Sequence, residues 1–195
     1  DLSGWTVVDE GWNAGPSNWS VVGGELAEST EITDRTGSAP DDLPKLGTYL
    51  RYDGGGAWSD TITRVRLRSV DDDAIGVVFR LVDGDNFYRF SMDSQRGYRR
   101  LVKNVGGVYT LLAEDSVAFN PGQSYALEIS AQGSTLEVRI DGAPVFSVQD
   151  SDLTGGTIGL YNWANSGAYF DDVSVEGLMA GGLPPTIDAV TVDPS

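Results

Sequence analysis

The sequence contains no histidine and no cysteine, and these two absences exclude much of enzyme chemistry. Without cysteine there are no disulfides, thiolate nucleophiles or Cys-ligated zinc sites. Without histidine there are no Ser-His-Asp or Cys-His pairs, no histidine general bases and no His-liganded metals. Any catalysis would therefore depend on carboxylates, Tyr, Lys, Arg or a hard metal ion bound by oxygen.

Positive charge is scarce as well. The 195 residues include 13 Lys and Arg against 29 Asp and Glu, for a formal net charge of −16. Nucleic acid is not expected as a partner, because phosphate binding needs a net basic surface. Membrane insertion is not expected either, since no run approaches the roughly 18 uncharged apolar residues of a membrane helix. The acidity and the lack of cysteine are compatible with a secreted bacterial protein.

What the sequence does have is alternation of apolar and polar residues. Residues 61–68 and 135–140 alternate with period 2, which is typical of strands with one buried face. Asp141 and Gly142 then form a hairpin turn signal. Turn signals recur roughly every 8–12 residues, a spacing typical of sandwiches and jelly rolls. We therefore predict an all-β fold, a two-sheet antiparallel β-sandwich.

The chain divides into two parts by composition. Residues 1–177 carry the strand pattern and are predicted to form one sandwich domain. Residues 178–195 begin with the Gly- and Pro-rich composition of a linker and continue with spaced apolar residues at Ile187, Val190 and Val192. We interpret this end as a linker and the start of a following β domain, so other domains of the same chain are expected partners.

Six segments of residues 1–177 resemble the concanavalin A-like, laminin-G-type jelly rolls. They are residues 19–26 (which end in Gly-Glu-Leu), 72–80, 86–92, 136–142, 156–161 and 170–175. The resemblance implies two curved antiparallel sheets with apolar inner faces packed together and one concave outer face. It is specific for the fold and not for the activity, because this fold hosts lectins, carbohydrate-binding modules, glycosidases and lyases.

The resemblance also implies a structural Ca²⁺ ion that joins the early strand to the last. Its ligands would be Glu25 with Asp171 or Asp172 and nearby backbone carbonyls, since calcium takes about 6–8 oxygen ligands. The alternative is that Asp171 and Asp172 only face outward at the start of a strand.

The few basic residues are concentrated in one segment. Residues 64–103 hold 9 Lys and Arg against 6 Asp and Glu, whereas the rest of the chain holds 4 against 23. The functional interpretation is a groove in which guanidinium groups, Arg80 and Arg89 among them, bind carboxylates, sulfates or sugar hydroxyls. The alternative is a solvated sheet face whose arginines are paired with Asp and Glu on adjacent strands.

Aromatic residues give a second signal for sugar binding. Sugar rings pack their C–H faces on aromatic planes, while their hydroxyls need Asn, Asp, Gln or Arg close by. Residues 93–99 and 161–165 combine these residue types. The predicted ligand-binding residues are Arg80, Arg89, Asp93, Arg96, Tyr98, Arg99, Tyr161, Asn162, Trp163 and Asn165.

Catalytic carboxylates are not evident. Glycosidases need two of them, and those built on this sandwich often carry a Glu-x-Asp-x-Glu type of run that the sequence lacks. Residues 71–73, Asp83 with Asp85 and Asp150 with Asp152 fall in turn-like contexts, where capping of an Asx-turn is the simpler explanation. Lyases of this fold commonly use a His and Tyr pair, and histidine is absent. We therefore do not expect an enzyme.

The sequence as a whole predicts a non-catalytic carbohydrate-binding module of a secreted or cell-surface multidomain bacterial protein. Its partner would be a polysaccharide or another glycan, and Ca²⁺ would brace the fold. The alternatives are a structural or adhesive laminin-G-like module of a tandem-domain surface protein and a carboxylate-dependent glycosidase. Which sheet face binds the glycan is left to the tertiary structure.

Overall fold

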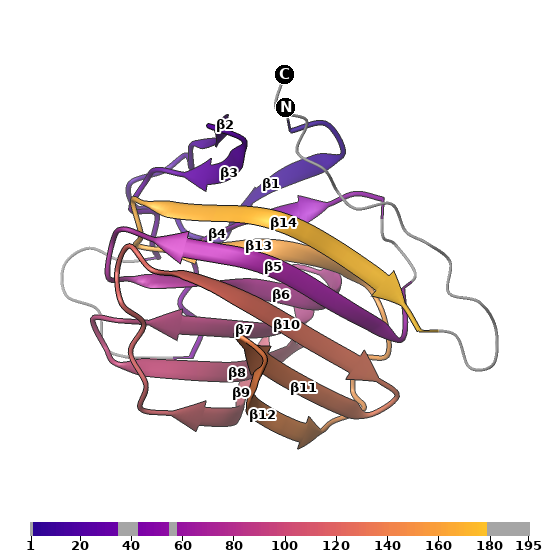
Figure 1. Ribbon diagram of the computed structural model, residues 1–195. Coiled ribbons are helices and arrows are strands. Elements are labelled where there is room, and N and C mark those ends of the chain that lie inside the picture. The colour runs from indigo at the N-terminus through magenta and orange to yellow at the C-terminus, as the bar shows by residue number, and fades with distance from the viewer. Residues whose placement is uncertain (1, 35–42, 55–57, 179–195) are drawn as a thin grey trace.

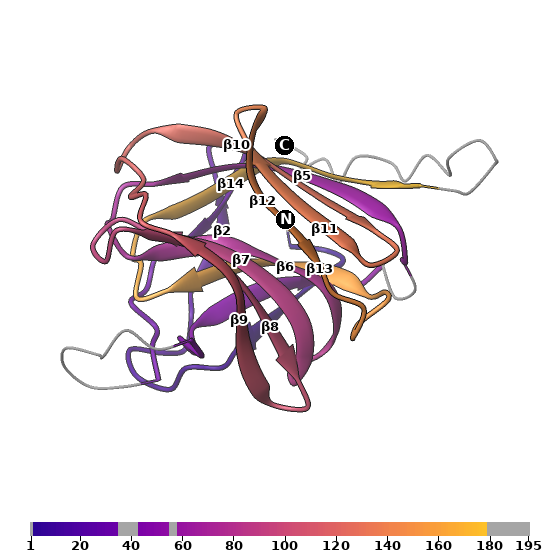
Figure 2. The ribbon, with the colours of Figure 1, turned by 90° about the horizontal axis from the view of Figure 1, so that it is seen from below.

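The computed structural model describes residues 2–34, 43–54 and 58–178, and the regular elements in these ranges are all strands. Fourteen strands form two antiparallel sheets of seven strands that pack face to face (Figures 1 and 2). The predicted all-β, two-sheet antiparallel sandwich is confirmed. Among the described residues no helix is long and apolar enough to cross a membrane.

The first sheet carries the strands that matter for the site. In spatial order it consists of β1 (Trp5–Asp9), β4 (Thr48–Tyr52), β13 (Thr157–Trp163), β6 (Ala74–Asp83), β7 (Asn86–Asp93), β8 (Tyr98–Val105) and β9 (Val108–Asp115). The second sheet consists of β12 (Ala143–Gln149), β11 (Thr135–Ile140), β10 (Ser124–Gln132), β5 (Thr61–Ser69), β14 (Ala168–Gly177), β3 (Glu25–Glu28) and β2 (Trp19–Val22).

The main core lies between the two sheets. Val77 and Phe90 of the first sheet and Val65 and Phe170 of the second are buried in it. A fully buried side chain of this size contributes about 1.5–3 kcal/mol to stability, so this interface holds the sandwich together. The alternation seen in the sequence produces it, because every second residue of a strand points to the same face.

The outer face of the first sheet is covered as well, which plain alternation does not predict. Strand β7 is buried on both faces from Phe87 to Asp93. A second apolar cluster there includes Tyr49, Phe87 and Trp163. The segment 43–46 lies against this face, since Arg89 donates hydrogen bonds to its carbonyl groups. A two-sided strand of this kind needs residues that pack on both sides.

The described part of the predicted sandwich domain ends with β14 at Gly177. The predicted linker and following strand at 178–195 lie, apart from Leu178, outside the described residues.

Candidate functional site

Aromatic and cationic side chains meet on the outer face of the first sheet. This group, called here the outer-face cluster, consists of Lys45, Arg89, Arg96, Tyr98, Arg100, Tyr161 and Trp163. Strands β7, β8 and β13 supply five of these residues. Lys45 comes from the segment before β4, and Arg96 comes from the turn between β7 and β8.

The cations of the cluster lie over the aromatic rings. The Lys45 ammonium nitrogen is 4.0 Å from the centre of the Trp163 ring, and the Arg96 guanidinium carbon is 4.7 Å from it. The Arg100 guanidinium carbon is 3.8 Å from the centre of the Tyr98 ring. Such contacts are worth about 0.5–2 kcal/mol each, depending on how far the cation is desolvated. The cluster is thus a set of aromatic planes with fixed hydrogen-bond donors beside them.

Strand pairing explains why these side chains share a face. In β13, Tyr161 and Trp163 are two residues apart and point the same way, whereas Asn162 points to the other face. Gly76 of β6 pairs in register with Tyr161 on one side and with Ser91 of β7 on the other. A Cβ atom on Gly76 would lie 2.0 Å from the carbonyl oxygen of Phe90, so only glycine fits there.

The segment 43–46 is bound to the buried donors of the cluster. The Arg89 guanidinium donates to the carbonyl oxygens of Leu43 at 2.7 Å and Pro44 at 2.9 Å. The Tyr161 hydroxyl donates to the carbonyl oxygen of Lys45 at 2.5 Å. Lys45 itself has a φ of 38°, in the left-handed region that non-glycine residues rarely occupy. The backbone of this segment therefore occupies hydrogen-bonding positions on the sheet face.

Two buried donors of the cluster have no hydrogen-bond acceptor within the described part of the chain. They are Nε of Arg89 and Nε1 of Trp163, and both side chains are only 2% exposed. Buried polar groups are bonded in the great majority of cases. Unpaired donors beside aromatic planes are the arrangement that a polyhydroxylated ligand would use.

Glu10, just after β1, adds an ionisable group to this face. Burial raises the pKa of its carboxyl to about 7, although the charge of Arg89 and a hydrogen bond with Tyr109 lower it. Its Oε2 atom is buried and accepts no hydrogen bond from the described residues. Sequence reasoning missed Glu10, Lys45 and Arg100. No local pattern marks Glu10 or Lys45, because each reaches the cluster only through tertiary contacts.

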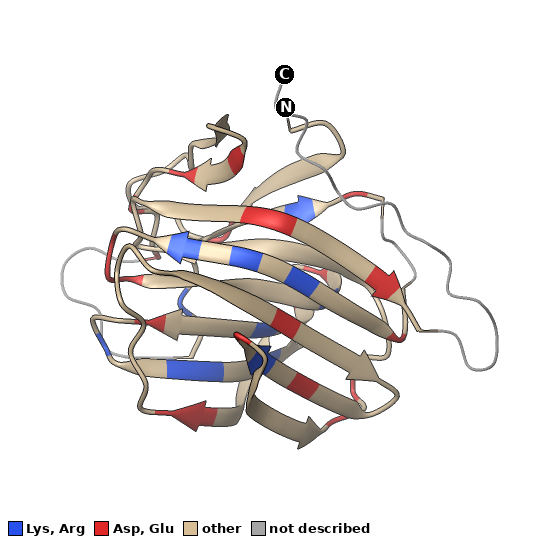
Figure 3. Ribbon diagram, in the orientation of Figure 1, with Lys and Arg blue, Asp and Glu red and all other residues tan. Residues whose placement is uncertain are grey.

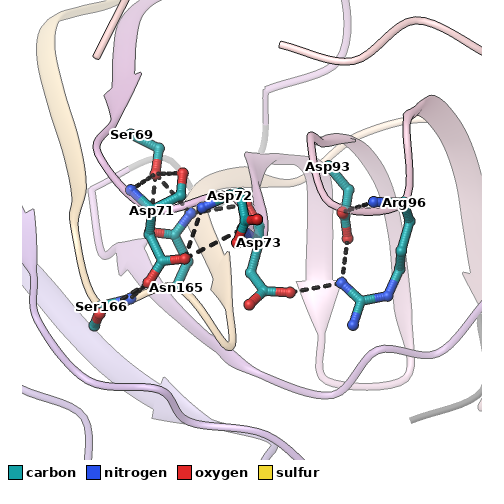
Figure 4. A network of polar contacts seen from close by, with 8 residues as sticks. All are labelled: Ser69, Asp71, Asp72, Asp73, Asp93, Arg96, Asn165 and Ser166. Carbon is teal, nitrogen blue, oxygen red and sulfur yellow. Dashed lines mark hydrogen bonds and ion pairs between the residues drawn. The ribbon is translucent and has the colours of Figure 1, made fainter. Parts of the chain in front are cut away.

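Figure 4 shows the polar network at the rim of the cluster. Nη1 of Arg96 donates to Oδ1 of Asp73 at 2.5 Å and to Oδ2 of Asp93 at 3.0 Å. The Arg96 backbone N–H also donates to Oδ1 of Asp93 at 2.8 Å. Burial raises the pKa of Asp73, and the adjacent Arg96 only partly offsets this. Arg96 is therefore held in place by two carboxylates while it lies against Trp163.

The aspartates of residues 71–73 build a turn. The Asp71 carboxylate accepts hydrogen bonds from the backbone N–H groups of Asp72 and Asp73 and from Ser166. Burial raises the pKa of Asp71, but these hydrogen bonds outweigh it and the pKa lies below its usual value. The same capping occurs at Asp83 and Asp150, which accept from the N–H two residues ahead. The Asx-turn interpretation is confirmed.

The ten predicted ligand-binding residues divide into two groups. Six lie on the outer face of the first sheet or at its rim: Arg89, Asp93, Arg96, Tyr98, Tyr161 and Trp163. The other four lie elsewhere: Arg80, Arg99, Asn162 and Asn165.

The four residues outside the cluster have structural partners. Arg80 donates to the carbonyl oxygens of Ser59 and Leu153, and Arg99 is paired with Asp115. Asn162 donates to the carbonyl oxygen of Asn165 at 2.7 Å and to the Glu28 carboxylate. Asn165 donates to Ser69 and to the carbonyl oxygen of Asp73, both at 2.8 Å. The structure therefore does not bring these side chains to the outer-face cluster.

The arginines of β5 lie on the other sheet from the outer-face cluster, where Arg64 and Arg66 line a pocket of about 390 Å³. Arg64, Arg66 and Arg68 face outward on the second sheet, with acidic residues on the neighbouring strands (Figure 3). Arg64 is paired with Glu128 and Glu176, Arg66 with Asp172, and Arg68 with Glu25. The structure agrees with the cross-paired alternative for these three residues, because their partners lie on adjacent strands.

Two of the three carboxylates predicted to hold calcium, Glu25 and Asp172, are paired with the same arginines. Glu25 accepts from Arg68 at 2.7 Å, and Asp172 is 2.5 Å from Arg66. Asp171 accepts from the backbone N–H of Asp172. Within the described residues, only the carboxylates of 71–73 form a group of three whose oxygens lie within 4.8 Å of one another. A calcium ion held by Glu25 with Asp171 or Asp172 and nearby backbone carbonyls stays a prediction, and it would have to compete with these arginine pairs.

A pocket of about 460 Å³ lies away from the cluster, at the other end of β13. It is lined by Arg51, Tyr52, Asp53, Ser59, Leu81, Val82, Thr154, Gly155, Gly156 and Thr157. None of the ten predicted ligand-binding residues is among them, and the exposed Arg51 and Asp53 are paired with each other. Its chemistry is less specific than that of the outer-face cluster.

The two packed seven-stranded sheets define a concanavalin A-like, lectin-type jelly roll. The family described as 3-keto-alpha-glucoside-1,2-lyase-like domain matches residues 1–176, and the chain belongs to this family. The comparisons support this lectin-type fold and not the laminin-G type specifically. The search of curated proteins gave no match.

Solved structures share the fold. The carbohydrate binding module CBM66 from Bacillus subtilis is 21% identical, with a TM-score of 0.69 over 88% of this chain and 94% of that one. A Bacillus subtilis protein of unknown function with a galectin-like fold is 12% identical, with a TM-score of 0.64 over 89% of each chain. Sheep galectin-11 is 12% identical, with a TM-score of 0.50 over 71% of this chain and 99% of that one.

Proposed function

We propose that this chain is a carbohydrate-binding domain whose glycan site is the outer-face cluster of the first sheet. The observation that carries the proposal is the set of aromatic planes, including Tyr98 and Trp163, with guanidinium groups fixed beside them. Aromatic planes accept the C–H faces of sugar rings, and the donors bind the hydroxyls. The unpaired buried donors on Arg89 and Trp163 add to this match.

The names of similar proteins point the same way. The family is named after an enzyme of glucosides, and one of the similar folds is named as a carbohydrate binding module. These names support a sugar as the ligand class. From the sequence we also propose that the protein is secreted or lies at the cell surface, and that the same chain contains further domains. The rival without glycan binding is a structural or adhesive laminin-G-like module.

The segment 43–46 covers the outer-face cluster, so a glycan must displace this segment in order to bind. Carbonyl oxygens of Leu43, Pro44 and Lys45 accept the hydrogen bonds of Arg89 and Tyr161. Sugar hydroxyls would use the same donors. In our proposal the glycan enters at the half-buried rim beside Arg96 and takes the place of this segment.

Turnover of a glucoside is the second candidate, and Glu10 favours it. A carboxyl whose pKa is raised to about 7 is still partly protonated at neutral pH and can donate its proton to a leaving oxygen. Tyr109 forms a hydrogen bond with it, and the charge of Arg89 acts on it. We rank binding first because a glycosidase also requires a second catalytic carboxylate, and the described candidates, Asp34 and Asp85, act on Glu10 only through their charges.

A glycan array with product analysis on every hit tests the proposal. We expect saturable binding without products for the wild-type chain. Arg100→Met, which removes the guanidinium over Tyr98, should weaken binding about tenfold or more. Arg66→Met on the second sheet is the matched control and should leave affinity unchanged. Products that disappear in Glu10→Gln would favour the enzyme, and no hit on the array would favour the adhesive module.

A further inference from the structure

The charges around the outer-face cluster carry information about the class of glycan. We propose that the site takes a neutral glycan and discriminates against uronate-containing and sulfated ones. This inference rests on the proposed function. It differs from the prediction from the sequence, in which the arginine excess of segment 64–103 favours an anionic polysaccharide slightly.

The positive charge of Arg96 is already compensated by carboxylates of the same chain. Its Nη1 atom contacts the carboxylates of Asp73 and Asp93, whose side chains are 16% and 0% exposed. An incoming sulfate or uronate would have to displace one of them. Replacing one carboxylate with another anion gains little Coulomb energy, and a buried Asp93 without its partner is strongly destabilising.

Arg100 and Arg89 are compensated in other ways. Nε of Arg100 donates to the Glu114 carboxylate. The Arg89 guanidinium is bound to the carbonyl oxygens of Leu43 and Pro44, and the Glu10 carboxyl acts on it electrostatically. Arg96 and Arg100 thus each have a carboxylate partner, and the Glu10 carboxyl offsets part of the charge of Arg89, so displacement of the segment 43–46 leaves little excess positive charge.

The balance can be stated as formal charges. The cluster holds four cations, Lys45, Arg89, Arg96 and Arg100. Three described carboxylates, Asp73, Asp93 and Glu114, are paired with Arg96 and Arg100. Glu10, whose pKa of about 7 leaves it partly protonated at neutral pH, supplies part of a fourth negative charge that acts on Arg89. The net charge of −16 on the whole chain repels polyanions further. Neutral hydroxyls, in contrast, can bond to the remaining donors and to carboxylate oxygens without breaking any of these pairs.

The first test is the salt dependence of binding on an array of neutral, uronate-containing and sulfated glycans. We expect hits among the neutral glycans, with affinities that change less than about twofold between about 20 mM and about 500 mM NaCl. Hits confined to acidic glycans and lost at high salt would overturn this inference and leave the proposed function standing. No binding to any glycan would instead overturn the proposed function.

A variant with one compensating carboxylate removed tests the same charge argument, because it should gain binding to a polyanion. Glu114→Gln removes the charge that compensates Arg100, and its side chain is 37% exposed, so folding should survive. We expect this variant to acquire salt-sensitive binding to dextran sulfate that the neutral array hit competes away. Asp172→Asn, which releases Arg66 on the second sheet, is the matched control and should show no competition by the neutral glycan. An unchanged Glu114→Gln variant would contradict the charge argument.

Discussion

The ammonium nitrogen of Lys45 lies 4.0 Å from the centre of the Trp163 ring, where a sugar ring would stack in the proposed site. The two residues are far apart in the sequence and meet only because the segment 43–46 crosses the outer face of β13. The chain thus covers its own aromatic plane with a cation. This arrangement accounts for a cluster that has the chemistry of a glycan site and is nevertheless buried.

Truncation of Lys45 should open the site. Lys45→Ala removes the cation–π contact with Trp163, so displacement of the segment costs less. We expect the affinity for the array hit, measured by calorimetry, to rise about tenfold. Trp163 should also become more accessible to acrylamide quenching. Arg66→Ala serves as the control, and equal or weaker binding by Lys45→Ala would show that Lys45 is not an internal competitor.

The pH dependence of stability should report on Glu10. Its pKa is about 7 in the folded chain, against a usual value of 4.5, so the folded state binds the proton more tightly. Stability is therefore highest when Glu10 is protonated and falls as pH rises from about 4.5 to about 7. Glu10→Gln removes this loss. Urea unfolding at several pH values should show the variant gaining about 2 kcal/mol relative to wild type across that window.

A flat difference between Glu10→Gln and wild type over the same pH range would contradict the assignment.

Two glycines should respond differently to the same substitution. Gly76→Ala places a Cβ atom 2.0 Å from the carbonyl oxygen of Phe90, so β6 and β7 must shift. We expect a loss of about 3 kcal/mol or more in the free energy of unfolding. Gly84→Ala, in the turn between the same strands, has no atom within 4 Å of the added carbon and should change stability by less than about 1 kcal/mol. Chemical denaturation of both variants checks the comparison.

Removing the buried carboxylate of Asp93 should lower the free energy of unfolding more than removing an exposed carboxylate. Asp93 is fully buried and bonds both the side chain and the backbone of Arg96. Asp93→Ala leaves Arg96 with one carboxylate fewer and should cost about 3 kcal/mol. Asp172→Ala breaks an exposed pair with Arg66 and should cost less than about 1 kcal/mol. Similar melting temperatures for the two variants would argue against a structural role for the rim network.

Part of the site could be predicted from the sequence because it follows from strand periodicity. Tyr161 and Trp163 are two residues apart in one strand and therefore share a face, and the same rule puts Asn162 on the other face. Applied strictly, the rule separates Asn162 from the candidate site. Arg80 could not be sorted this way, because it lies at an irregularity of β6 with a φ of 45°.

The sequence by itself determined the all-β class, the alternation of each strand and the Asx-turns, because these depend on residues close together in the chain. Only the tertiary structure decided that the charge of Arg89 acts on Glu10, that Arg68 pairs with Glu25, and that Lys45 covers Trp163. Such contacts depend on which strands become neighbours and in which register. That choice is made by the packing of the whole chain, and no local pattern specifies it.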